Sequence, residues 1–93
     1  MTDDDEVNFR VDDVFRLEGR GGPILVGRMD GGGQLRVGDQ LGFQTSDGDA
    51  AVLTIIGFDL TPAAAMGELS LVVTGEHSDE VRAGTSLRRL PHQ

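Results

Sequence analysis

The sequence predicts an all-β fold, namely a small closed antiparallel β-barrel of six or seven strands. Two observations lead to this prediction. Apolar and polar residues alternate with a period of two along several short segments, which is the pattern of half-buried strands. Breaks that contain glycine separate these segments at intervals of roughly 8–12 residues, a spacing typical of sandwiches and barrels.

The first strand is expected at residues 9–17. Phe9, Val11, Phe15 and Leu17 share one parity, and polar residues occupy most positions of the other parity. Asp13 is the exception, because it shares the parity of the apolar residues. We expect Asp13 at the barrel rim, where a backbone group or an arginine satisfies its carboxylate.

The other elements follow from runs of strand-forming residues between turn residues. Strands are expected at residues 24–29, 35–37 with a continuation at 41–43, 51–58, 69–74 and 85–90. Residues 51–58 contain enough apolar side chains to be buried on both faces. Short helical turns are expected at residues 61–66 and 78–82. The predicted core contains Phe15, Leu25, Val26, Val37, Leu41, Ile55, Val72 and Leu87.

Glycine is expected where the chain bends sharply. Gly27 interrupts a strand, which suggests a bulge or a barrel corner. Gly38 and Asp39 predict a tight turn, in which Gly38 adopts positive φ and the Asp39 side chain bonds the local backbone. The run at residues 46–49 predicts another turn.

Length and composition point to one domain at residues 9–93. The chain has 93 residues and no cysteine, which excludes a disulfide framework, a thiolate zinc site and a cysteine nucleophile. No apolar run approaches the ~20 residues of a transmembrane helix, and no charged-then-apolar leader is visible. We therefore expect no membrane partner and a cytoplasmic location.

Residues 1–8 are expected to form a disordered acidic tail. Four consecutive acids, at positions 3–6, carry no apolar periodicity and cannot bury enough surface to offset the entropy of ordering. An acidic docking arm remains the alternative.

One stretch of the sequence is more specific than generic strand and turn. The run DDVFRLEGRG at residues 12–21, followed by VGR at residues 26–28, resembles the opening of domain 2 of the translational GTPases, as in elongation factor Tu. That opening has the pattern D-V-F-x-I-x-G-R-G-T-V-V-T-G-R. Looser similarity continues through GQLRVGDQL at residues 33–41, LVVTG at 71–75 and VRAGTSL at 81–87.

The resemblance implies a closed barrel of six or seven strands that, in the family, packs on a GTPase domain and touches RNA. This chain has no phosphate-binding loop of the GxxxxGK[ST] type and no Lys at all, so we expect no GTP binding. Thr74 stands where the family has an Arg near the aminoacyl end of tRNA. The GTPase domain would then be supplied by another chain, or the module has been re-purposed.

Charge argues against RNA as the default partner. The formal net charge is −8, and the eight basic residues are all Arg. An acidic domain repels phosphate on average. Arg20 and Arg28 approach each other if the first two strands pair as a hairpin, which would give a site for one phosphate or carboxylate. The alternative is that both arginines pair with Asp30, Glu18 or their neighbours.

No motif in the chain predicts catalysis. Residues 76–80 hold metal-ligand residue types, but a polar loop with helix-capping residues is the better interpretation. Asp47 and Asp49 lack the other ligands of a calcium loop, so a hairpin turn is the better interpretation. Asp12 and Asp13 are adjacent, so they should lie on opposite strand faces rather than act as a carboxylate pair. We expect no catalytic, cofactor or metal site.

The expected function is therefore a non-catalytic binding module for a macromolecular partner, with a protein favoured over RNA and self-association left open. The alternative is an RNA- or ribosome-associated accessory protein that acts through Arg20, Arg28 and Arg36. The candidate partner-binding residues are Arg20, Gly21, Arg28, Arg36 and Thr74.

Overall fold

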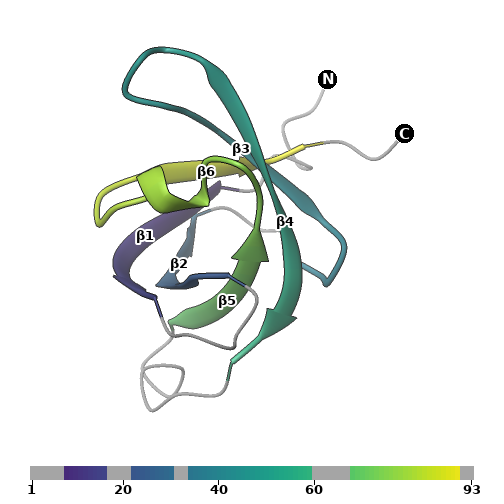
Figure 1. Cartoon of the computed structure of the whole chain (residues 1–93). Helices are drawn as coiled ribbons and strands as arrows, with labels where there is room; N and C mark the ends of the chain where they lie inside the picture. The colour runs from purple at the N-terminus through teal and green to yellow at the C-terminus, as the bar shows by residue number, and fades with distance from the viewer. Residues whose placement is uncertain (1–7, 17–21, 31–33, 60–67, 91–93) are drawn as a thin grey trace.

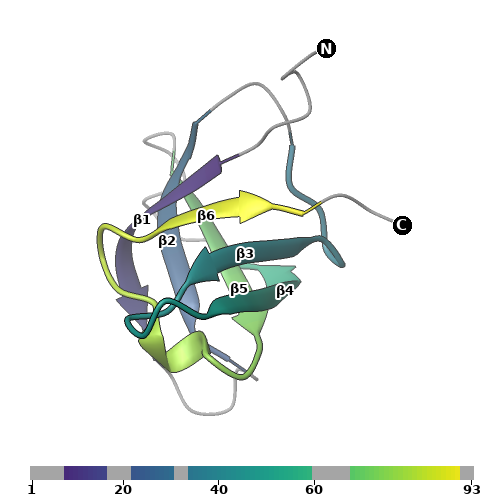
Figure 2. The same ribbon diagram turned by 90° about the horizontal axis from the view of Figure 1, so that it is seen from above.

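The computed structural model describes residues 8–16, 22–30, 34–59 and 68–90. Within these residues, six antiparallel strands form a closed barrel, as the sequence predicts (Figure 1). The order around the barrel is β1-β2-β5-β4-β3-β6, so the last strand closes the barrel between the first and the third (Figure 2). The strands are β1 (Asn8–Phe15), β2 (Ile24–Asp30), β3 (Gln40–Gln44), β4 (Ala50–Phe58), β5 (Leu69–Thr74) and β6 (Ser86–Arg89).

Most predicted elements lie close to their expected positions. The 3-10 turn η2 (Ser78–Glu80) occupies the short helix expected at 78–82. Asn8 belongs to β1, so the barrel begins one residue earlier than predicted. The strand expected at residues 35–37 is absent, because this stretch is a loop and turn that leads into β3. The predicted tail apart from Asn8, and the helical turn at 61–66, lie outside the described residues.

The barrel interior is filled by fully buried aliphatic side chains and one phenylalanine. Every strand contributes to this cluster, so burial of the core requires all six strands. Val26 and Val72 are buried as predicted, but they form a second small cluster with Ile24. The main core consists of Phe9, Val11, Leu25, Leu41, Leu53, Ile55, Leu71, Val73, Val81 and Leu87.

A β-bulge in β1 changes which side chains point inward. The register with β2 shifts between Val11 and Asp13, which makes Asp12 the extra residue. After the bulge, Val14 packs against the core and Phe15 points outward with 48% of its surface exposed. The prediction that Phe15 is a core residue is therefore wrong, because a simple alternation cannot include an inserted residue.

Asp12 and Asp13 are both exposed, so neither points into the barrel. The Asp13 carboxylate accepts a hydrogen bond of 2.9 Å from the backbone N–H of Val14, which is a backbone partner of the predicted kind. Because the bulge shifts the alternation, Asp13 faces outward although it shares the parity of Phe9 and Val11.

β4 is buried on one face only, which corrects the expectation of burial on both faces. Ala51, Leu53 and Ile55 point into the core, while Val52 and Ile56 are each 43% exposed. A second register shift, between Ile55 and Gly57, places Ile56 in a bulge opposite β5. The closed barrel has one interior, so the other face of each strand is covered only where another segment packs on it.

The turn before β3 has the predicted chemistry. Gly38 has a φ of +99°, and the Asp39 carboxylate accepts a 2.9 Å hydrogen bond from the backbone N–H of Arg36. The turn is tied to β4 through Ile55, whose N–H donates to the Asp39 carbonyl. Val37 lies in this turn and is 61% exposed, so its predicted place in the core is wrong.

Gly27 lies where two strands approach most closely. It pairs with Val11 beside the β1 bulge, and a Cβ at this position would collide with the carbonyl oxygen of Arg10 and lie 2.9 Å from the Phe9 ring. Only glycine leaves room for this approach, which agrees with the predicted bend at Gly27.

We expect Gly27→Ala to lower the free energy of unfolding by about 3 kcal/mol or more, a large share of the ~5–15 kcal/mol of a small domain. Gly57→Ala is the matched control, because nothing lies within 4 Å of a Cβ built there. Urea unfolding followed by circular dichroism measures both changes. Equal stability of the two variants would contradict the packing described for Gly27.

Candidate functional site

The three predicted partner-binding residues that the structure describes do not form one site. Arg20 and Gly21 lie outside the described residues. Arg28 is on β2, Arg36 is in the turn before β3, and Thr74 ends β5. In the ladder between β2 and β5, Ile24 pairs with Val72 and Gly27 with Leu69, so Arg28 and Thr74 lie at opposite ends. Six positions at ~3.3 Å each separate them by roughly 20 Å.

Arg28 lies in a locally balanced cluster of charges. Its Nε is 3.8 Å from Asp12 and 3.9 Å from Glu68, and its Cα partner on β1 is Arg10. These ion pairs are long and exposed, so each contributes little to stability. A hydrogen bond with the Asp12 side chain, together with desolvation and the charge of Asp12, raises the pKa of Glu68 against the opposing effect of Arg28. The sequence-based alternative that Arg28 pairs with nearby acids holds, although the partners differ from those expected.

A row of arginines crosses the outer face of β2, β1 and β6. Arg10 lies opposite Arg28 on one side and opposite Ser86 on the other, and Arg88 is two residues beyond Ser86 on β6. Diagonal neighbours of this kind are roughly 7–8 Å apart, within reach of long side chains. Arg10 and Arg88 are exposed, and the side chain of neither forms an ion pair or hydrogen bond with another described residue.

Arg88 also borders a groove on the outer face of β3, β4 and β6. The groove has a volume of about 340 Å³ and is mostly apolar. Gly42 carries no side chain and is covered by the Leu90 side chain, 3.1 Å from where a Cβ would lie, so Ala50 and Val52 form the exposed apolar floor. None of the described lining residues is acidic. They are Gly42, Phe43, Gln44, Ala50, Ala51, Val52, Arg88 and Leu90.

The groove residues were not singled out from the sequence. Alternation along β6 places Arg88 outward, which the sequence could have indicated. Its neighbours Gly42 and Val52 come from β3 and β4, and only the barrel order brings these strands beside β6. The sequence does carry one indication of a groove: two small residues, Gly42 and Ala50, lie at outward-facing positions of two neighbouring strands.

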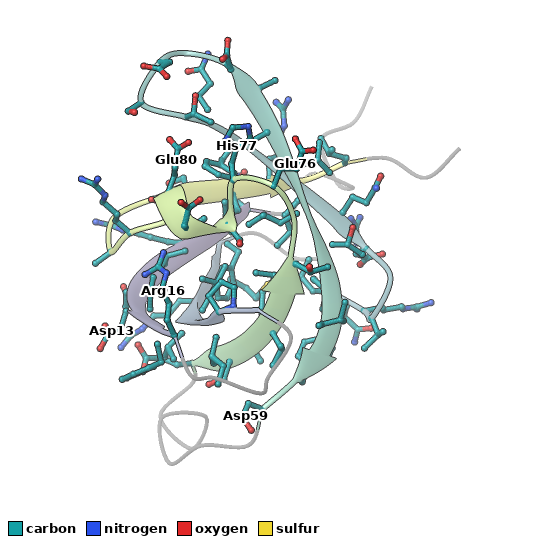
Figure 3. The ribbon with its side chains drawn as sticks, viewed as in Figure 1. Asp13, Arg16, Asp59, Glu76, His77 and Glu80 are labelled. Carbon is teal, nitrogen blue, oxygen red and sulfur yellow. The ribbon has the colours of Figure 1, made fainter. Side chains whose placement is uncertain are left out.

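A second polar cluster lies around η2. His77 Nδ1 is 2.9 Å from Glu80 Oε2, and Figure 3 shows the two side chains next to each other. The other carboxylate oxygen, Glu80 Oε1, accepts a 3.4 Å hydrogen bond from the backbone N–H of Ser46 in the β3–β4 turn. Arg16, beyond the end of β1, donates to the carbonyl oxygens of Ser78, Asp79 and Val81 at 3.0–3.2 Å. This cluster ties η2 to two separate parts of the barrel.

The polar-loop interpretation of residues 76–80 fits these contacts. The described residues contain no group of three or more His, Cys, Asp and Glu side chains that could hold a metal ion. Asp47 and Asp49 lie in the β3–β4 turn, where Gly48 has a φ of +89° and the Asp49 N–H donates to Thr45 Oγ1. This is the hairpin turn that the sequence favours over a calcium loop.

The chain matches no family model, no curated protein and no solved structure. Among the described residues, no helix has the length and apolar character to cross a membrane. Any assignment of function therefore rests on the chemistry of the surfaces described above.

The His77–Glu80 contact predicts a pH dependence. The hydrogen bond with Glu80 raises the pKa of His77, and the reciprocal contact lowers the pKa of Glu80. The contribution of His77 to stability is then fully present below its ordinary value of ~6.5 and is lost as the pH rises through the raised value. The contribution of Glu80 is present above ~4.5 and is lost as the pH falls. The pair contributes most between these limits.

We expect Glu80→Gln to shift the pKa of His77 back toward its ordinary value, because the hydrogen-bonded negative charge is removed. The titration of the His77 ring proton by NMR measures the shift. Glu76→Gln is the matched control, since Glu76 acts on His77 only through longer-range charge. A larger change in the control than in Glu80→Gln would contradict this assignment of the partner.

Proposed function

We propose that this chain is a non-catalytic β-barrel module that binds a macromolecular partner, and that the partner is a protein. The observation that carries the proposal is the groove on β3, β4 and β6, where exposed apolar surface adjoins Arg88. Protein interfaces combine an apolar centre with arginine and a polar rim. A phosphate-binding surface needs several unpaired cations instead.

The distribution of charge supports a protein partner over RNA. Arg16 is engaged with carbonyl groups at η2, Arg28 is flanked by two carboxylates, and the Arg89 side chain donates to the Gln34 carbonyl at 2.7 Å. The chain has no Tyr or Trp, and Phe43, the aromatic residue that lines the groove, packs partly into the core. With a net charge of −8, the remaining arginines act against a repulsive background.

The resemblance to domain 2 of translational GTPases adds to this proposal. The six-stranded closed barrel is the fold that the resemblance implies, and in the family this domain packs on another domain. A fold by itself does not fix a function, so the resemblance supports docking on a protein without identifying it. On this proposal the chain binds no GTP and acts beside other proteins in the cytoplasm.

An RNA-associated accessory role is the second candidate. The observation that favours it is the row formed by Arg28, Arg10 and Arg88 on adjacent strands, which could follow a phosphate backbone. Asp12 and Glu68 at one end of this row weaken the case, because they offset the charge of Arg28.

We expect binding to generic single- or double-stranded RNA to be weaker than about 1 μM at physiological salt, since few arginines are available for phosphate. Fluorescence anisotropy of labelled RNA measures the affinity over a range of salt concentrations. Tighter binding that weakens with salt and disappears in an Arg10→Gln, Arg28→Gln double variant would replace the protein proposal with the RNA one. If the partner is a protein, a protein captured from native lysate by this chain should remain bound after nuclease treatment.

A further inference from the structure

We propose that the groove on β3, β4 and β6 binds an acidic, extended segment of a partner protein, which places an apolar side chain on the groove floor and a carboxylate on Arg88. This inference rests on the proposed protein-binding function and specifies the chemistry of the partner. It follows from the shape of the groove and from the charge at its border.

The shape of the groove suits a side chain of a docked segment. On the outward parity of β3 and β4, Gly42 pairs with Val52 and Gln44 with Ala50. Three of these four residues are small or apolar, and Val52 keeps 43% of its surface exposed. Burial of exposed apolar surface by a partner favours binding by roughly 25 cal/mol per Å² of area buried. The volume of about 340 Å³ is at the lower end of the range for binding pockets.

The charge of the groove selects an acidic ligand. Arg88 is the single charged residue among the described lining residues, so the groove is locally positive although the net charge of the chain is −8. Arg10, on the diagonal across β1 and β6, adds a second exposed cation beside it. A carboxylate near the apolar anchor would accept hydrogen bonds from the Arg88 guanidinium, which matches carboxylate geometry well.

The position of the groove along β3 favours an extended segment as the ligand. β3 pairs with β4 along all five of its residues but with β6 only at Leu41 and Gly42, so Phe43 and Gln44 continue beyond the ladder with β6. The lining follows β3 from Gly42 to Gln44. Leu90, whose N–H donates to the Gln40 carbonyl, and Arg88, which pairs with Gly42, border one part of it, and Phe43 and Gln44 form the other. A groove that extends along a strand in this way accommodates a single extended chain.

A selection from a library of short random peptides, displayed on phage and applied to the immobilised full-length chain, tests the inference. We expect enriched peptides to combine a Leu, Ile, Val or Phe with a neighbouring Asp or Glu. Arg88→Glu should reverse the charge preference toward Lys and Arg, because the one charged side chain among the described lining residues changes sign. Arg82→Glu is the matched control, since Arg82 is an exposed arginine in the turn before β6 and does not line the groove.

Two further variants examine the groove itself with the best acidic peptide. Arg88→Gln should weaken binding by about fivefold, the loss expected for one charged contact at a partly exposed site. Val52→Asp should abolish detectable binding, since it places a carboxylate on the apolar floor. Both positions are on the outer face, and circular dichroism checks that each variant keeps the β spectrum.

The outcomes separate this inference from the proposed function. Enrichment of peptides without an acid, or an unchanged preference in Arg88→Glu, would overturn the groove assignment. If the wild-type chain and Val52→Asp capture the same nuclease-resistant protein partner, the proposed function stands and the inference fails. RNA that competes with the acidic peptide, or a second copy of the chain that occupies the groove in sedimentation experiments, would also overturn it.

Discussion

The rest of this structure depends on how six short strands bend enough to close around one small core. Two bulges provide the bend, one at Asp12 in β1 and one at Ile56 in β4. The first lies beside Gly27, where the two strands approach too closely for any side chain on β2. Because an inserted residue reverses the facing of those that follow, the bulge also decides that Val14 is inside and Phe15 outside. Closure and surface chemistry are therefore set by the same local feature.

The surface of this acidic protein uses its arginines in distinct ways. Arg16 joins β1 to η2 through three carbonyl groups, and Arg28 is held between carboxylates on the outer face. These contacts partly neutralise the positive charge of Arg16 and Arg28, so the electrostatic attraction of this surface for a polyanion is weak. Arg88 differs because it adjoins apolar surface, and none of the described residues that line this groove is acidic. That combination, rather than the total number of arginines, is what makes the groove the strongest candidate for a partner.

Strand positions were predictable from the sequence, while the direction of several side chains was not. The alternation in residues 9–11 and 51–55 gives the correct inward residues up to each bulge. Beyond the first bulge, the alternation wrongly predicts Phe15 in the core, because the sequence carries no sign of an extra residue in β1. Val37 was misassigned for a different reason: its alternation with Leu35 resembles a strand, but the turn at Gly38 and Asp39 uses the backbone groups that a strand would need.

The sequence by itself determined the fold class, the glycine turns and the acidic background, because these depend on residues that are neighbours along the chain. It also supplied the expectation of a binding module through its resemblance to a translation-factor domain. Only the tertiary structure decided that Arg28 and Thr74 lie at opposite ends of a ladder, and that Arg88 lies beside Gly42 and Val52. Those neighbours come from strands far apart in the sequence. Their contacts are fixed by the order β4-β3-β6 around the closed barrel, which no local pattern records.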